Sequence, residues 1–250
     1  MNEVIATMMN HRSVRCFKDE LLTDEQIVKI VEAAQMASSS SFMQSYSIIG
    51  ITDKQVKDEL GAITGLPYVA NNGHLFIFCA DLHRVTVMGS EAEREEMKSM
   101  LESSAFYQIA VTDTALAAQN ALLAAESMGL GGVMLGAIAR NLTRLDELLQ
   151  LPQYVVPLFG MAVGVPDQQT DTKPRLPVPA VYFENHYSTN LEEQRERIEE
   201  YDERMRAYYL NRSENVRDDT WSKKHIAVLQ SKAPVQHFTR YIQSKGLNRK

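Results

Sequence analysis

The chain has 250 residues, of which 44% are hydrophobic and 23% are charged, which is enough to form a substantial core in one large globular domain with or without an extension. Its formal net charge of −6 gives no indication of a surface for nucleic acid or an anionic membrane, so an anion-binding site must be a local basic cluster. No stretch approaches the roughly 20 apolar residues that span a bilayer, and the N-terminus lacks a basic and apolar leader pattern, so we expect a soluble intracellular protein.

The two cysteines, Cys16 and Cys79, are too few for a disulfide framework, and the six histidines show no metal-ligand spacing. We therefore expect no metal site and a reducing cytoplasm as the compartment. Cys16 stands beside two arginines, a setting found around reactive thiols. A nucleophile also needs a base and an oxyanion site, and because the sequence indicates neither, we favour a non-catalytic Cys16.

Residues 10–17 read NHRSVRCF and form the first donor-rich cluster. Arg12 and Arg15 are three positions apart, so they would share a face on a helical turn and point to opposite sides on an extended segment. The donors outnumber the acceptors nearby, since only Asp19 and Glu20 follow closely. A guanidinium group matches phosphate or carboxylate in two-point geometry, which favours an anionic ligand. Pairing of both arginines with surface acids at a helix end is an equally good interpretation of these residues alone.

The next elements are a helix and two strands. Thr23 and Gln26 form a capping-box pattern ahead of an apolar series at helical spacing, which predicts an amphipathic helix that ends at the serine run 38–41. The apolar segments 45–52 and 74–80 are rich in aromatic and β-branched residues and predict strands, with a further helix between them.

The middle of the chain alternates helices with strands. Residues 105–128 are rich in Ala and Leu, carry few charges and end at Gly129, which predicts a long buried helix. Strands are predicted after it at 133–138 and 154–166, with a helix at 141–151 between them. Four strands alternating with helices favour a layered fold with helices on both faces of a sheet.

The glycine-rich segment 129–132 reads GLGG and does not fit the dinucleotide fingerprint, which follows a strand and opens a helix, whereas here a helix comes first. We interpret these glycines as a cap and a turn. The end of the next strand offers small or flexible positions that would present bare backbone to a flat ring: Met134, Leu135, Gly136 and Ala137.

After residue 177 the chain becomes strongly charged. A helix predicted over 191–212 places five apolar residues along one stripe: Leu191, Ile198, Tyr201, Met205 and Tyr208. A long charged helix with a narrow apolar stripe is more often an arm packed on another surface than a separate domain. Its charges taken alone would favour a solvated surface helix.

Donor-rich segments recur at the ends of predicted elements, at 11–15, at 38–41 with Gln44, and at 173–175. Element ends are the usual place for binding groups in layered folds. Together the three segments would enclose an anion attached to a large polar ligand.

Seven motifs follow in order from about residue 3 to the end of the chain: HRSVRCFKDELL, SSSSFMQSYSIIGITD, FCADLHR, AAQNALLAAESMGLGGV, LPQYVVPLFGMAVGVP, KPRLP, and YYLNR with DDTWS. They resemble the NADPH-dependent flavin reductase and oxygen-insensitive major nitroreductase branch of the nitroreductase superfamily. The resemblance implies an α+β fold, a three-layer α/β/α sandwich with an extended helical C-terminal arm, in a homodimer with one FMN at each end of the interface. It also implies an FMN-binding core at 1–177 and an arm for dimerisation and NADPH binding at 178–250.

The resemblance also implies site residues, motif by motif. Those for FMN are His11, Arg12, Ser13, Val14, Arg15, Ser39, Met134, Leu135, Gly136, Ala137, Lys173, Pro174 and Arg175. Those for the NADPH phosphates are Arg212 and Arg217. Lys173 and then Arg15 are the cations expected to stabilise the negative charge of reduced flavin. No side chain is expected to act as a catalytic acid or base, because protons can come from water.

Some residues depart from the pattern of the family or oppose it. Relatives often carry Gly-Gly-Gln where this chain has the one-residue-shorter TGLPYV, so groups with fewer donors near 66–68 replace a glutamine contact to flavin. Ala137 stands where some relatives have the second glycine of a pair. Glu214, Asp218 and Asp219 would repel an NADPH phosphate unless they point away.

The function implied by the resemblance is that of an FMN-dependent oxidoreductase, which uses NADPH to reduce flavins, nitroaromatics or quinones by two-electron ping-pong hydride transfer. Its partners would be a second copy of the chain and small-molecule electron acceptors, with no nucleic acid and no membrane. The alternative is a non-catalytic FMN carrier or a flavin-dependent sensor, but such a protein has no use for a second phosphate site at Arg212 and Arg217.

Overall fold

The computed structural model describes residues 2–212, 215–231 and 236–250, which form two compact units. The core unit contains the chain up to Thr170 together with the C-terminal segment 236–250, and the arm unit contains 171–212 and 215–231. None of the described helices is both long enough and apolar enough to cross a membrane.

The core unit is built on a four-stranded sheet in the order β1-β2-β4-β3, in which every neighbouring pair is antiparallel. The strands are β1 (Tyr46–Ile51), β2 (His74–Asp81), β3 (Gly131–Leu135) and β4 (Val155–Gly164). All four predicted strands are thereby confirmed. The third one begins and ends earlier than predicted, because the chain turns into a 3-10 helix after Leu135. An antiparallel sheet between helices is the α+β arrangement, not a parallel βαβ series.

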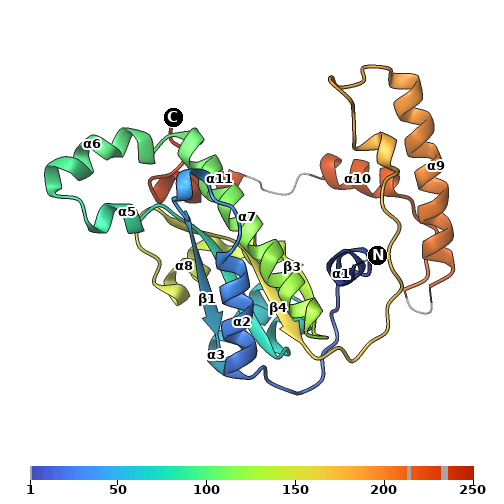
Figure 1. Ribbon diagram of the computed structural model, residues 1–250, viewed down its shortest axis with the longest axis horizontal. Helices are drawn as coiled ribbons and strands as arrows, with labels where there is room; N and C mark the ends of the chain where they lie inside the picture. Colours follow the sequence, from blue (N-terminus) through green and yellow to red (C-terminus); the bar gives the residue numbers. More distant parts are fainter. Residues whose placement is uncertain (1, 213–214, 232–235) are drawn as a thin grey trace. The chain divides into compact units, whose positions relative to one another are not determined.

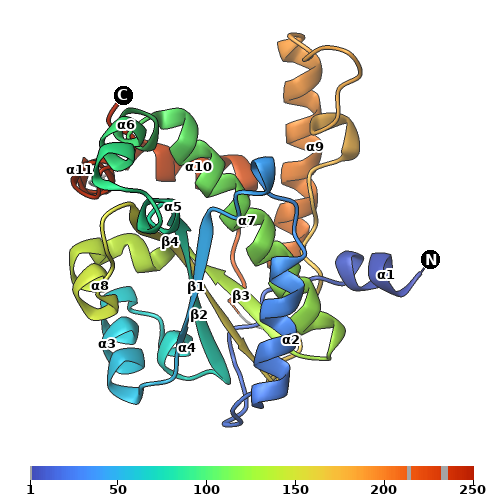
Figure 2. The same ribbon diagram turned by 60° about the vertical axis from the view of Figure 1, so that its left-hand side comes forward.

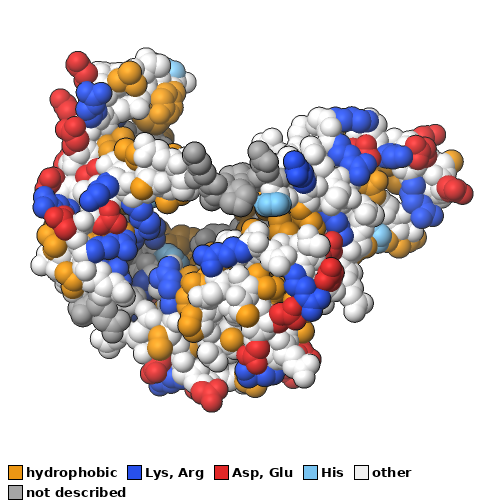
Figure 3. Space-filling view, turned by 180° about the vertical axis from the view of Figure 1, so that it is seen from behind, with side chains coloured by type: hydrophobic (Ala, Val, Ile, Leu, Met, Phe, Trp, Pro, Cys, Tyr) orange, Lys and Arg blue, Asp and Glu red, His pale blue; other side chains and the backbone are white. Residues whose placement is uncertain are grey.

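Helices cover both faces of this sheet and form the outer layers of a three-layer sandwich (Figures 1 and 2). The ten helices described in the core unit are α1 (Glu3–Met9), α2 (Asp24–Gln35), α3 (Lys54–Thr64), α4 (Pro67–Ala70), α5 (Arg84–Val87), α6 (Glu91–Leu101), α7 (Ser104–Ser127), η2 (Gly136–Asn141), α8 (Leu142–Leu149) and α11 (Gln236–Ser244), in addition to the 3-10 turn η1 (Ser40–Phe42). Figure 3 shows charged side chains of both signs over the end of the core unit where α6 lies.

The central strand β2 is buried along its whole length and divides the core into two apolar clusters. Leu75 and Ile77 point to the cluster that contains residues of α3, α4 and α8, whereas Phe76 and Phe78 point to the cluster that contains residues of α2 and α7. This alternation follows from the two-residue period of a strand, because each face of β2 meets a different helical layer.

Local sequence signals account for the helix ends. In α2 the side chain of Thr23 accepts from the backbone of Gln26 and the Gln26 side chain accepts from the backbone of Thr23, so the predicted capping box is confirmed. The buried helix predicted at 105–128 is α7, and Gly129 follows it with a left-handed φ of 78°. Helix α6 was not predicted, although Ser90 and Glu93 form the same kind of capping box.

The boundary between the two units differs from the predicted boundary at residue 177. The segment 236–250 packs with the core unit, where Ile242 and Leu247 join the cluster on the α8 side of the sheet. Lys245 Nζ also lies 3.0 Å from Asp146 Oδ1 on the core. The sequence pattern alone placed this segment with the arm because it follows the charged helix. The separate roles assigned to the core and the arm stay predictions.

The arm unit contains η3 (Val178–Ala180), α9 (Leu191–Leu210) and α10 (Trp221–Gln230). Its apolar cluster is formed by Tyr201, Met205 and Tyr209 of α9, with Trp221 of α10 packed against it. The predicted stripe is therefore confirmed at Tyr201, Met205 and Tyr208, the last of which packs half-buried against the cluster, and is wrong at the exposed Leu191. Tyr209, which was not predicted, is the third buried residue of the cluster.

Candidate functional site

The HRSVR segment runs along the sheet as an extra partner of its edge. Ser13 forms a parallel bridge with Gly132 of β3, and the Val14 amide donates to the Gly132 carbonyl at 3.1 Å. The Val14 side chain is buried, with 4% of its surface exposed. A Cβ on Gly131 would lie only 2.5 Å from Val14 Cγ2. The interpretation of the glycines as a cap and turn is therefore right for Gly129 and wrong for 131 and 132, which belong to β3. Gly131 allows the close approach of this segment, whereas Gly132 allows the close approach of Leu122 on α7.

The two arginines of this segment are exposed, with extended backbone between them. The Arg12 guanidinium donates to the Asn10 carbonyl at 3.4 Å and that of Arg15 donates to the Ser13 carbonyl at 3.5 Å, both of which are long hydrogen bonds. Within 2–212, 215–231 and 236–250, neither arginine forms an ion pair. Pairing with surface acids is thus not how the described structure uses them, and their donors remain available for an anion.

The histidine of the segment has a different neighbour. His11 Nδ1 lies 2.6 Å from Glu126 Oε1, near the end of α7. Glu126 and Arg12 also line a cavity of about 420 Å³ with Gln168, whose side-chain oxygen accepts from the Arg15 amide at 3.1 Å. Because the carboxylates of Glu3 and Glu126 line this cavity together with the guanidinium group of Arg12, the charge of its lining does not by itself favour an anion. The sequence did not predict Gln168 as a neighbour of Arg15, because nothing in its local sequence indicates a contact with a residue 153 positions away.

The residues at the end of β3 provide exposed backbone. Leu135 itself is buried, whereas Met134 and Ala137 on either side of the turn are half-buried. Gly136 is exposed, and a Cβ placed on it would meet nothing within 4 Å. Such a backbone strip next to the HRSVR segment fits the requirement of a flat ring with a phosphate tail, since the main chain can contact the ring and the two arginines can hold the phosphate.

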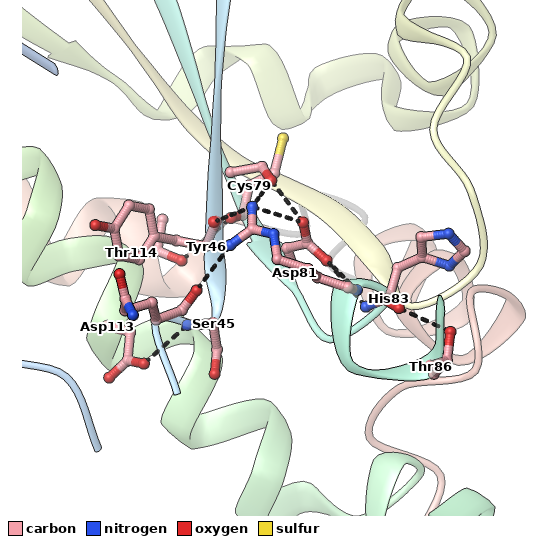
Figure 4. Close-up of polar contacts among 11 residues, drawn as sticks. Ser45, Tyr46, Cys79, Asp81, His83, Thr86, Asp113 and Thr114 are labelled. Carbon is pink, nitrogen blue, oxygen red and sulfur yellow. Dashed lines mark hydrogen bonds and ion pairs between the residues drawn. The ribbon is translucent and has the colours of Figure 1, made fainter. Parts of the chain in front are cut away.

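Ser39 lies directly before η1, half-buried and with extended backbone. The loop that follows it is held by Asp113, a carboxylate of α7 that the sequence reasoning missed (Figure 4). One signal was present, because Asp113 is the only charged residue between Ser104 and Ala125 of an otherwise apolar, buried helix.

The arm unit brings together two cations predicted for different ligands. Lys173 Nζ lies 5.6 Å from the centre of the Tyr209 ring, and the Arg217 guanidinium carbon lies 4.1 Å from the centre of the same ring. Burial raises the pKa of the Tyr209 phenol, but hydrogen bonds from Lys173 and Arg217 outweigh burial and lower the pKa overall. The Tyr201 hydroxyl donates to the Pro174 carbonyl at 3.0 Å, which ties the KPR segment to α9. Sequence reasoning did not predict either tyrosine as a support for these cations.

The acids near the predicted NADPH arginines are already paired. Asp218 binds Arg206, with its Oδ1 2.6 Å from the guanidinium Nε, and Asp219 lies 3.3 Å from Arg217. Arg212 lies 5.7 Å from the Tyr208 ring centre. Glu214 lies outside the described residues. The repulsion expected between Asp218 and an NADPH phosphate is therefore weakened by Arg206. Asp219 forms an ion pair with Arg217 itself.

The shortened segment near 66–68 forms the start of the short helix α4. Leu66 is its N-cap and Pro67 its first residue, and the Leu66 amide donates to the Thr64 hydroxyl at 3.4 Å. Tyr68 is half-buried and packs against the core. Within Leu66, Pro67 and Tyr68, the Tyr68 hydroxyl is the one side-chain donor.

Comparisons with known proteins agree with this fold. A model described as the nitroreductase family matches residues 8–165, and a model of the nitroreductase family C-terminal domain matches residues 173–250. The chain belongs to the nitroreductase family. It is 44% identical over all 250 residues to a protein of Bacillus subtilis (strain 168) called FMN reductase (NADPH), and the match covers 100% of both chains.

Two solved structures show the same relationship. NfrA1 of B. megaterium is 45% identical, with a TM-score of 0.94 over 99% of this chain and 100% of that chain. An NADPH:FMN oxidoreductase of Vibrio harveyi, complexed with NAD+, is 36% identical, with a TM-score of 0.88 over 100% of both chains. The predicted α+β sandwich is therefore confirmed.

Proposed function

We propose that this protein is an NADPH-dependent FMN reductase and nitroreductase that reduces flavins, nitroaromatics or quinones. The observation that carries the assignment is that the guanidinium groups of Arg12 and Arg15 are exposed and have no carboxylate partner in the described chain. They lie on a segment that bridges to β3, the strand that the exposed Gly136 follows. When bound, FMN would supply two-electron hydride chemistry between NADPH and the acceptor, for which we expect ping-pong kinetics.

The chain's own residues would bind and orient the cofactor. Arg12 and Arg15, with His11 and Ser13, are the donors for the FMN phosphate, because fork-shaped guanidinium groups form charge-assisted hydrogen bonds with phosphate oxygens. The main chain at 134–137 offers its peptide groups to the ring. Lys173 is the first candidate to stabilise negative charge on the reduced ring, with Arg15 second. Proline 174 and Arg175 belong to the same donor segment of the arm unit.

The NADPH phosphates are assigned to Arg212 and Arg217 of the arm unit. Both guanidinium groups lie over tyrosine rings, which restricts their motion before a nucleotide binds. A flavin carrier would have no use for such a second phosphate site. We place the protein in the cytoplasm, where NADPH and reduced thiols are available.

A second copy of the chain is the proposed protein partner. Helix α1 buries none of its residues within the core unit, and it exposes four large apolar side chains, those of Val4, Ile5, Met8 and Met9. Exposed apolar side chains gathered on one short helix favour an interface, and the family resemblance assigns that interface to a homodimer.

The assignment is tested with purified full-length protein loaded with FMN. Anaerobic addition of NADPH should bleach the flavin absorbance within one turnover, and a nitroaromatic or free flavin should restore it. Slow or absent bleaching would contradict a reductase and favour the carrier. The variant Arg12→Ala should bind FMN about 10- to 150-fold more weakly, since it removes a charge-assisted contact of about 1.5 to 3 kcal/mol. Arg94→Ala, an exposed arginine on α6, is the control and should bind FMN normally.

A further inference from the structure

The loop between α2 and β1 contains an unusual backbone. Ser41, Phe42 and Gln44 all have left-handed φ values, of 49°, 57° and 53°, although none of them is glycine. Such conformations persist only where surrounding contacts hold them. This loop begins at Ser39, which the family resemblance assigns to FMN binding, so the contacts that hold the loop also determine where Ser39 lies.

The carboxylate of Asp113 accepts hydrogen bonds from backbone amides at both ends of this loop. Its Oδ1 accepts from the Ser40 amide at 3.0 Å and its Oδ2 accepts from the Ser45 amide at 3.1 Å. The Asp113 side chain comes from the middle of α7, and only 1% of the residue is exposed. In the described part of the chain it takes part in no salt bridge, and the two loop amides donate to it. Figure 4 shows Asp113 beside Ser45 with the bond between them.

The guanidinium group of Arg84 holds the carbonyl groups where the loop enters β1. Its Nη1 donates to the Gln44 carbonyl at 3.3 Å, and its Nη2 donates to the Tyr46 carbonyl at 3.2 Å. Arg84 is itself held by Asp81, whose Oδ2 lies 3.5 Å from Nη2. An anion therefore accepts from N–H groups of the loop and a cation donates to its C=O groups. Each charge has the sign that stabilises the peptide dipole it contacts.

We propose that Asp113 is a positioning residue for flavin binding, and that Arg84 supports it: together they hold the 39–45 loop in the conformation in which Ser39 contacts FMN. This inference rests on the proposed function. The charge of Asp113 matters more than its shape, because two amides donate to it. An asparagine has one acceptor oxygen and would direct its own NH₂ donor at the other amide.

The test uses full-length Asp113→Asn and two readouts. The first is amide hydrogen exchange of the peptide covering 37–47 in protein stripped of flavin, which we expect to become at least 10-fold faster. The second is the Kd for added FMN, which we expect to rise at least 10-fold. Thr114→Val is the matched control, because Thr114 is the next residue of α7, fully buried, and donates only to the carbonyls of Cys79 and Ala110. It should lower the Tm without altering either readout.

Arg84→Met provides a second variant if Asp113→Asn does not fold, because the Arg84 side chain is 59% exposed. We expect it to raise both the exchange rate and the FMN Kd about threefold. Faster exchange with an unchanged FMN Kd would overturn the inference, as would an equal loss of FMN affinity in Thr114→Val. If wild-type protein itself fails to bind FMN, the proposed function is wrong and this inference falls with it. If wild type binds and the variants bind equally well, only the role of Asp113 is wrong.

Discussion

At the scale of single residues, the arginine predicted for NADPH is restrained before any nucleotide is present. Arg217 lies against Tyr209 and pairs with Asp219, so replacing it removes a preformed contact as well as a charge. The consequences of this arrangement for cofactor choice are open to direct measurement.

We expect Arg217→Ala to raise KM for NADPH about 10- to 150-fold, which corresponds to one lost phosphate contact of about 1.5 to 3 kcal/mol. KM for NADH should change little because NADH lacks the 2′-phosphate, and kcat should change less than KM. The measurement is kcat/KM for both nucleotides at fixed ionic strength. Arg204→Ala, at an exposed arginine of α9 in the same unit, is the control. Equal losses with both nucleotides would show that Arg217 does not read the 2′-phosphate.

A second residue-scale feature is a buried imidazole next to a buried ammonium group. His74 is 5% exposed, its Nε2 has no hydrogen-bond partner in the described structure, and Lys57 is buried nearby with its Nζ 3.1 Å from Asn72 Oδ1. Burial, with a smaller contribution from the charge of Lys57, lowers the pKa of His74 to about 4. Burial likewise lowers the pKa of Lys57.

This shift predicts a loss of stability in acid. The unfolded chain binds a proton at His74 below about pH 6.5, whereas the folded chain binds it only near pH 4, so the free energy of unfolding falls as the pH drops between these values. We expect His74 to account for roughly 3 kcal/mol of this fall, with the full stability present above about pH 6.5. His74→Gln should remove that part of the slope in denaturant unfolding measured across this range. An identical slope in the variant would contradict a neutral buried His74.

At the scale of elements, the C-terminal segment is a structural part of the core unit. Lys245 is 5% exposed, and its Nζ donates to both carboxylate oxygens of Asp146 on α8, at 3.0 and 3.1 Å, and to the Leu151 carbonyl at 2.7 Å. Arg249 adds an ion pair with Glu102, at 2.9 Å. These contacts hold α11 and the residues after it against α8 and the end of α6.

We expect Lys245→Met to lower the free energy of unfolding by about 3 to 5 kcal/mol, because it leaves the partly buried Asp146 without its cation. Adding Asp146→Leu should recover part of this loss, since the unpaired carboxylate is then gone. Lys250→Met, at an exposed lysine of the same segment, should change stability by less than about 0.5 kcal/mol. Urea unfolding of the three variants makes the comparison, and a wild-type stability in Lys245→Met would refute the anchoring role.

At the scale of the whole molecule, the proposed homodimer follows from apolar surface that one chain leaves uncovered. Helix α1 has no buried residue, and Ile5 and Met8 are 47% and 51% exposed. Covering such side chains removes apolar area from water and favours association.

We expect the protein to elute with a light-scattering mass of twice its 28.2 kDa chain mass. Ile5→Asp combined with Met8→Asp should raise the dimer dissociation constant at least 10-fold, because each side chain contributes about 1.5 to 3 kcal/mol when fully buried. Met36→Asp is the control, at an 83% exposed side chain directly after α2. A monomeric wild type would contradict the dimer, and a variant with unchanged dimer affinity would place the interface elsewhere.

The sequence by itself determined the elements whose signals are local. The capping box at Thr23, the apolar helix of 104–127 and the four strands follow from patterns within a few residues, because helix ends and strand faces depend on nearby side chains. The donor-rich HRSVR motif and the family resemblance were likewise evident from the sequence alone.

Only the tertiary structure decided which distant groups meet. The antiparallel strand order, the passage of Val14 over Gly131, the grip of Asp113 on an amide 68 positions away and the return of α11 to the core all join segments far apart in the chain. A local pattern cannot specify these contacts, because they depend on how both faces of the sheet are covered and on the pairing of buried polar groups across layers.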